Sequence, residues 1–174
     1  MSPMPACMVG SDMSSDTLQE LQLASFCLGE SRFCVDIMRI REILLPQQIC
    51  AMPRASRLLS GMINLRGAVV PVVSLRSRFD METSATVGGK LMIMSVGGRL
   101  VALAVDDVEE VLTVQVRDIV PPPEMADGVG GEYLVGVCLC NGLMYLILDI
   151  DALFTPAEKR ELGRFSGELP HGDV

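Results

Sequence analysis

Three groups of neighbouring carboxylates have the residue types and spacing that come closest to acid–base chemistry. They are Asp106-Asp107, Glu109-Glu110 and the pair Asp149 and Asp151. Two close carboxylates can exchange a proton with a substrate when burial or repulsion raises the pKa of one of them. The surrounding sequence offers no perturbing partner for any of these groups. We therefore predict that they are solvated strand ends and a helix cap and do not form a catalytic pair.

The single histidine and the six cysteines restrict nucleophilic, metal and redox chemistry. His171 stands alone near the end of the chain, so no histidine-based triad or metal site can be assembled. The cysteines occupy positions 7, 27, 34, 50, 138 and 140, without C-x-x-C spacing. Cys138 and Cys140 share one face of a predicted strand but lack the geometry for a bridge. We predict small buried hydrophobic residues with no metal and no cofactor; a thiol redox sensor is the remote alternative.

Two other sequence features suggest binding chemistry but have simpler explanations. The glycine pairs at 88–89, 97–98 and 130–131 lack the G-x-G-x-x-G or Walker pattern, which predicts hairpin turns and not phosphate loops. The 12 methionines are consistent with a promiscuous Met-rich groove, but filling of core gaps is the preferred interpretation.

Net charge and hydropathy patterning indicate the cellular location of the protein and exclude some classes of partner. The formal charge of -8 without a basic stripe excludes nonspecific binding to nucleic acid or to an anionic membrane surface. No apolar run reaches the roughly 18 to 20 residues of a membrane-spanning helix, which excludes direct membrane insertion. The N-terminus lacks the basic region and apolar core of a signal peptide. We therefore predict a cytoplasmic protein.

The element that must position any functional residue is a hairpin over residues 61–75, GMINLRGAVVPVVSL. Two β-branched runs flank a polar break in which Gly67 supplies the backbone freedom of a tight turn. Pro71 has no amide N–H, so we expect the second strand to lie at a sheet edge or to bend there. Arg66 must project into solvent or meet a carboxylate. It is either an anchor for a partner or a bare turn residue.

The sequence then repeats itself after about 70 residues. The pentapeptide IREIL at 40–44 returns as VEEVL at 108–112, and residues 136–150 align with 61–75 without a gap. Self-similarity of this length indicates two copies of one small unit. Each copy holds some five short strands, spacing that is typical of a small closed barrel. We predict a mostly all-β fold of two five-stranded barrels side by side, with an aliphatic, Met-rich core.

Boundaries follow from changes in composition along the chain. Residues 1–20 are predicted to be a flexible leader, and residues 21–154 the main domain. Within it the first barrel is placed at about 35–80 plus part of the chain ends, and the second at about 90–150. Thr155 and Pro156 predict the start of a C-terminal helix over 155–165, and residues 166–174 form a polar tail.

Five motifs occur in a distinctive order: FCVDIMRIREIL, GMINLRGAVVPVVSL, AVDDVEEVL, IVPPPE and EYLVGV. In this order they resemble CheW-like proteins, the coupling scaffolds of bacterial chemotaxis arrays. The likeness covers about residues 21–154, and its N-L-R-G-x-V-x-P-V core is its most specific part. It implies two SH3-like five-stranded barrels, in agreement with the repeat.

The resemblance also implies a function and a set of contact residues. Similar proteins are non-enzymatic adaptors that bridge the regulatory domain of a CheA-type histidine kinase and the cytoplasmic helical hairpin of chemoreceptors, and are recruited to membrane-associated receptor arrays. Positions that contact the kinase match Ile40, Glu42 and Ile43. The region that meets the receptor tip matches Gly61, Arg66, Val108 and Val111.

One departure from the family pattern and one alternative function accompany this prediction. Ser74 stands where similar proteins usually have Asp, so Arg76 and Arg78 have no predicted local partner and no predicted role. The alternative is a scaffold of the same kind in a non-flagellar pathway, such as pilus motility, development or second-messenger output.

Overall fold

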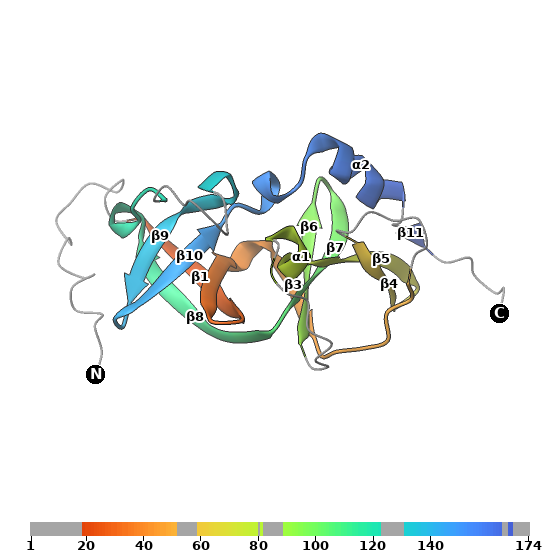
Figure 1. Cartoon of the computed structure of the whole chain (residues 1–174), viewed down its shortest axis with the longest axis horizontal. Helices are drawn as coiled ribbons and strands as arrows, with labels where there is room; N and C mark the ends of the chain where they lie inside the picture. The colour runs from red at the N-terminus through yellow and green to blue at the C-terminus, as the bar shows by residue number, and fades with distance from the viewer. Residues whose placement is uncertain are drawn as a thin grey trace.

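The computed structural model describes residues 19–51, 59–79, 81, 89–122, 131–164 and 167–168. Most of them form β-strands, arranged as two sheets that lie side by side (Figure 1). The strands are β1 (Glu20–Leu28), β2 (Ser31–Asp36), β3 (Ile40–Leu44), β4 (Leu59–Leu65), β5 (Ala68–Ser74), β6 (Lys90–Val96), β7 (Arg99–Val105), β8 (Asp107–Gln115), β9 (Leu134–Cys140), β10 (Leu143–Leu148) and β11 (Gly167–Glu168). The helices are α1 (Leu75–Arg78), α2 (Pro156–Arg164) and the 3-10 turns η3 (Ile37–Arg39), η4 (Val116–Asp118), η5 (Gly131–Tyr133) and η6 (Ile150–Leu153). The predicted fold class is confirmed, while most of the predicted leader and tail lies outside the described residues.

Each sheet is nearly closed. Sheet A has the strand order β8-β1-β2-β10-β9, and sheet B has β3-β6-β7-β5 with β4 on the other side of β5. In sheet A the chain continues past β8 to Val120, which exchanges two backbone hydrogen bonds with Val137 of β9. In sheet B the chain continues past β3 to Cys50, which does the same with Met62 of β4. These bridges join the two end strands of each sheet, as expected for small SH3-like barrels.

The assignment of strands to the two barrels differs from the sequence-based boundaries. We predicted residues at about 90–150 to form one barrel, but β6 and β7 pair within sheet B, whereas β8, β9 and β10 pair with β1 and β2 in sheet A. The first hairpin of the first copy, β1 and β2, thus pairs with strands β8–β10 of the second copy. The first hairpin of the second copy, β6 and β7, pairs with strands β3–β5 of the first copy. Strand spacing along a sequence indicates where strands and turns lie, but not which strands pair over long separations.

The exchanged hairpins are held by equivalent parallel pairings. Ile147 of β10 lies opposite Cys34 of β2 in sheet A. At the repeat-equivalent positions, Val72 of β5 lies opposite Ala102 of β7 in sheet B. The same register in both sheets shows that the repeat in sequence is also a repeat in strand pairing.

The buried core joins the two sheets. Separate apolar clusters fill the interiors of sheet A and sheet B, and a larger cluster takes residues from both. Within this larger cluster Phe33 of β2 stacks between Phe26 of β1 and Phe79 after α1, with ring centroids 5.8 and 5.3 Å apart. Met92 and Met94 of β6 are also fully buried in it. Met38 and Met144 are exposed, so the described core is mainly aliphatic, as predicted, but not rich in methionine. The shared cluster makes the two barrels one packed unit.

Pro71 lies within β5, where the sequence led us to expect an edge or a bend. β4 pairs along one side of β5, and the other side is shared by β11 at Ala68–Val69 and by β7 at Val72–Ser74. Pro71 falls between these two partners, so its missing N–H breaks no ladder hydrogen bond on that side. The strand is consequently central and not an edge.

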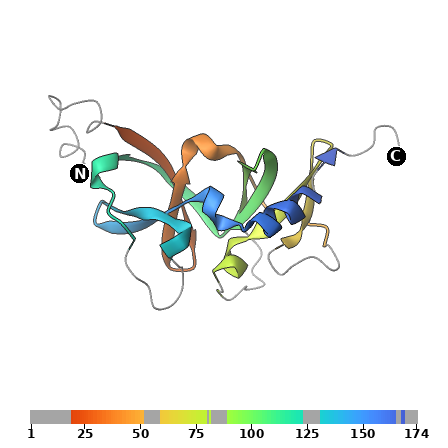
Figure 2. The same ribbon diagram turned by 90° about the horizontal axis from the view of Figure 1, so that it is seen from above.

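Helix α2 covers sheet B (Figures 1 and 2), and Arg78 links it to α1, the short helix that follows β5. The guanidinium of Arg78 donates to the Glu158 carboxylate at 2.5 Å and to the Tyr133 hydroxyl at 3.0 Å. Arg76 of α1 pairs with Asp106 at 2.5 Å. As predicted, neither arginine pairs with a carboxylate close to Ser74 in the sequence. Both pair instead with carboxylates from distant parts of the chain, which the sequence did not indicate. In the described part of the chain, no helix combines the length and apolar character required to cross a membrane.

Candidate functional site

The structure brings two predicted contact residues together as an exposed ion pair. Arg66, in the turn between β4 and β5, donates to both carboxylate oxygens of Glu42 on β3, with nitrogen–oxygen distances of 2.5 and 3.3 Å. The Arg66 side chain is 70% exposed and that of Glu42 31%. A two-point contact fixes orientation as well as distance. The hydrogen bond from Arg66 holds the pKa of the Glu42 carboxyl below its usual value, so both groups stay charged.

The backbone of Arg66 is in an unfavourable conformation for its residue type. Its φ is 51°, and Gly67 follows with φ 89°. Two consecutive positive φ values define the tight turn that Asn-Gly favours, and a bulky side chain there is uncommon. Gly67 donates its N–H to the Asn64 side chain at 2.8 Å, which closes the turn. The hairpin therefore holds an arginine where an asparagine would fit with less strain.

On β3, Ile40 and Ile43 flank Glu42. Ile40 is half-buried against the shared core, whereas Ile43 is 42% exposed. The strand bulges between Ile40 and Glu42 in its pairing with β6. An exposed aliphatic side chain next to an oriented carboxylate is a suitable anchor for a partner protein.

Gly61 shapes the chain on the other side of this site. A Cβ at this position would lie 2.3 Å from the Cys50 carbonyl oxygen and 2.6 Å from Ile49 Cγ2. Only glycine therefore lets the segment after β3 pair with β4. Its repeat equivalent, Gly136, has the same role in sheet A, where a Cβ would lie 2.6 Å from the Val120 carbonyl oxygen.

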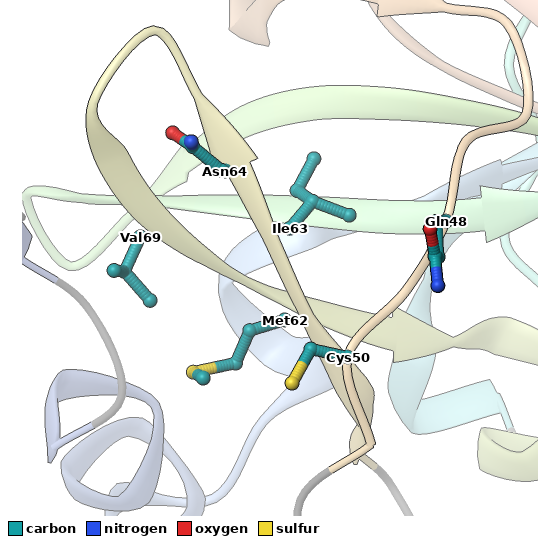
Figure 3. Close-up of a pocket in the computed structure, with 6 residues that line it drawn as sticks. All are labelled: Gln48, Cys50, Met62, Ile63, Asn64 and Val69. Carbon is teal, nitrogen blue, oxygen red and sulfur yellow. The ribbon is translucent and has the colours of Figure 1, made fainter. Parts of the chain in front are cut away.

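A hollow of about 360 Å³ lies beside the same hairpin. Met62, Ile63 and Asn64 project from β4, and Gln48 and Cys50 line it from the neighbouring segment (Figure 3). Val69 of β5 completes the lining. The sequence analysis did not identify this hollow, because it depends on the pairing of Cys50 with Met62.

Val108 and Val111 lie on β8 in sheet A, away from the sheet that carries Arg66. Val108 packs against the shared core and Val111 is 52% exposed. They lie opposite Phe26 and Ala24 of β1. Because β8 is the repeat equivalent of β3, these two valines correspond in place and exposure to Ile40 and Ile43. The predicted receptor-contact residues are thus divided between two sheets.

Most carboxylates of the predicted groups form ion pairs or a cap. The pKa of Asp106 is lowered by a hydrogen bond from Arg76, that of Asp107 by one from Lys90, and that of Asp151 by one from Arg39. Asp149 accepts the N–H of Asp151 and caps η6, as predicted. These perturbing partners were not visible in the sequence. A lowered pKa keeps a carboxylate ionised, which is opposite to what a general acid requires.

The cysteines only partly follow the prediction of burial. Cys34 and Cys138 are buried, Cys27 and Cys140 are half-buried, and Cys50 is exposed. Cys7 lies outside the described residues. A hydrogen bond with Cys138 and burial raise the pKa of Cys34 far above that of a free thiol, so this cysteine is not a reactive thiolate. No group of three or more potential metal ligands occurs among the residues that the structure describes.

Comparison with known proteins gives consistent matches across the folded part of the chain. The family model of the CheW-like domain matches residues 22–158. A chemotaxis protein CheW of Rhizobium meliloti (strain 1021) is 38% identical over 141 residues, 80% of this chain and 90% of the relative. A chemotaxis protein CheW of Treponema pallidum (strain Nichols) is 32% identical over 150 residues, 83% of this chain and 88% of the relative.

A solved structure extends this similarity to three dimensions. The crystal structure of the scaffolding protein TtCheW from Thermoanaerobacter tengcongensis superposes with a TM-score of 0.72 and 26% identity, over 79% of this chain and 89% of that one. These matches confirm the resemblance that the five motifs predicted. They do not favour the alternative non-flagellar pathway.

Proposed function

We propose that this chain, which belongs to the CheW-like domain family, couples a CheA-type histidine kinase to the cytoplasmic tip of a chemoreceptor. The family is one of non-enzymatic chemotaxis scaffolds, and this chain is a member by its family match and its relatives. Its function is then to hold other proteins in a defined relation. In this role it is recruited to the receptor array.

The observation that carries the proposal is the Glu42–Arg66 ion pair. An exposed pair of this kind contributes only about 0–1 kcal/mol to stability. A non-glycine residue in the left-handed region costs roughly 1–2 kcal/mol. The pair therefore has no clear advantage for folding, and a binding role accounts for an arginine at this strained position.

We assign one partner to each of the two elements that the ion pair connects, strand β3 and the turn between β4 and β5. Glu42 and Ile43 on β3 contact the regulatory domain of the kinase, with Ile40 supporting the strand from the core side. Arg66 contacts the receptor hairpin, and the neighbouring hollow accepts an apolar side chain from it. Because Glu42 binds Arg66 directly, a change at one contact alters the geometry of the other. Val108 and Val111 supply a second apolar strand face in sheet A toward the receptor.

A calorimetric titration with the regulatory domain of a cognate kinase tests this function. The variant Glu42→Lys is expected to bind at least tenfold more weakly than the wild type, because it loses the carboxylate and repels Arg66. The matched control is Glu110→Lys, the same charge change at the repeat-equivalent position of β8, and it is expected to bind as the wild type does. Equal binding by wild type and Glu42→Lys would refute the kinase contact.

A further inference from the structure

The structure describes twelve lysines and arginines, and half of them form ion pairs with carboxylates. The remaining cations among the described residues are Arg41, Arg99, Arg117, Lys159, Arg160 and Arg164. Four of these six line a single open hollow of about 630 Å³, between α2 and the turn that joins β6 to β7. On a chain with a net charge of -8, such a concentration of positive charge is unexpected.

The hollow is built from two elements that are distant in sequence. Lys159, Arg160 and Arg164 come from α2, and Arg99 from the first residue of β7. Arg160, Arg164 and Arg99 are exposed, whereas Leu162 points to the core and anchors the helix. Arg160 and Arg164 are one helical turn apart and therefore lie on the same side of α2.

Gly163 lies against the guanidinium of Arg99, the fourth cation of the hollow. A Cβ at Gly163 would lie 2.8 Å from Nε of Arg99 and 3.1 Å from its Cζ, so the guanidinium rests directly on the helix backbone. The absence of a side chain at Gly163 leaves the space in which the Arg99 guanidinium lies, next to the three cations of α2.

We propose that this basic hollow binds an acidic protein segment that carries several carboxylates. Its open shape and the spread of its cations along more than one helical turn suit an extended chain better than one small anion. Guanidinium groups bind carboxylates in a two-point manner, and three of the four cations are arginines. Neither α2 nor the β6–β7 turn contributes to the Glu42–Arg66 pair, so this surface is separate from the kinase and receptor contacts proposed above.

The alternative explanation is that the cations only complement the negative end of the α2 dipole. The substitution Gly163→Ala separates the two explanations. The added methyl group displaces the Arg99 guanidinium from its position against the helix. A site for an acidic segment is expected to bind a carboxylate-rich peptide and to bind it less tightly in this variant, whereas cations that only stabilise the helix predict no binding by either chain.

The direct experiment is fluorescence anisotropy of a labelled deca-glutamate peptide, with a deca-glutamine peptide as the uncharged control. We expect the full chain to bind only the acidic peptide, and the variant Arg160→Glu/Arg164→Glu to bind it at least tenfold more weakly. The matched control is Arg41→Glu/Arg117→Glu, which changes the net charge equally at two arginines outside the hollow and is expected to retain binding.

Three outcomes would overturn the proposal. Equal loss in both double variants would show nonspecific attraction, and no binding of deca-glutamate by the wild type would exclude the site. Binding to vesicles of three parts phosphatidylcholine and one part phosphatidylserine, without binding of the peptide, would identify a lipid surface as the ligand. Circular dichroism of each variant shows whether the fold is intact. None of these results depends on the kinase or the receptor.

Discussion

Arg66 and Asn141 occupy the same turn position in the two copies of the repeat, with φ values of 51° and 55°. Each is followed by a glycine of positive φ, Gly67 or Gly142. Asparagine is the residue that this conformation favours, and sheet A has it. In sheet B an arginine takes its place and reaches Glu42. The two halves of the fold have thus diverged at the position where we infer contact with a partner.

The substitution Arg66→Asn separates folding from coupling. It restores the favoured turn residue and removes the ion pair, so the free energy of unfolding is expected to stay within about 1 kcal/mol of the wild type. Receptor-dependent activation of the kinase is expected to be lost. Urea unfolding and a reconstituted kinase assay measure the two effects. A strongly destabilised variant would show instead that Arg66 is structural.

Gly61→Ala is expected to destabilise the closure of sheet B. The added methyl group would collide with the Cys50 backbone, and relief requires the segment after β3 to move, at a cost of about 1–3 kcal/mol. Gly67→Ala is the comparison, because nothing lies within 4 Å of a methyl group added there and only its φ of 89° is unfavourable. Urea unfolding should rank Gly61→Ala as the more damaging change. The reverse order would contradict the packing role of Gly61.

Protonation of Asp106 is expected to contribute to the loss of folding stability at low pH. Its pKa lies below the usual 3.8, chiefly because Arg76 donates a hydrogen bond to it, and Gly29 N–H donates another at 2.7 Å. A carboxyl whose pKa is lower in the folded state adds stability above its unfolded pKa and loses it as the pH falls through the folded value. Asp106→Asn should therefore cost roughly 1 kcal/mol at pH 7 and nothing at the acid end of the titration.

Chemical unfolding between pH 2 and pH 7 measures this difference. Asp118→Asn, at an exposed carboxylate of η4, serves as the control and should follow the wild-type curve. A constant gap between wild type and Asp106→Asn at every pH would show that the lost stability does not come from the charge of Asp106.

The exchanged hairpins predict that neither half of the chain folds alone. A chain divided between Gly88 and Gly89 separates β1 and β2 from the β8–β10 strands that complete sheet A, and β6 and β7 from sheet B. Each fragment is expected to lack the β-sheet signal in circular dichroism, and an equimolar mixture to recover it. A fragment that folds by itself would show that a hairpin can pair within its own half.

How much of the structure could be predicted from the sequence depends on how far apart in the chain the interacting residues lie. The hairpin at 59–74 and its copy were predictable, because alternating apolar residues and turn glycines act locally. The exchange of hairpins was not, because it depends on pairing between residues such as Cys34 and Ile147, more than a hundred positions apart. The contact of Arg66 with Glu42 also required the closed sheet. Cys50 is exposed against the usual habit of cysteine, since its backbone and not its side chain makes the closure.

The most direct test of the coupling claim is receptor-dependent kinase activity reconstituted with charge-swapped variants. Glu42→Arg and Arg66→Glu are each expected to lose most of the activation, because each places like charges side by side. The double variant restores an oppositely charged pair but presents reversed charges to the kinase and the receptor, so it is expected to exceed both single variants and to stay below the wild type. A double variant no more active than the poorer single variant would contradict the account, because it would mean that Glu42 and Arg66 do not act through each other.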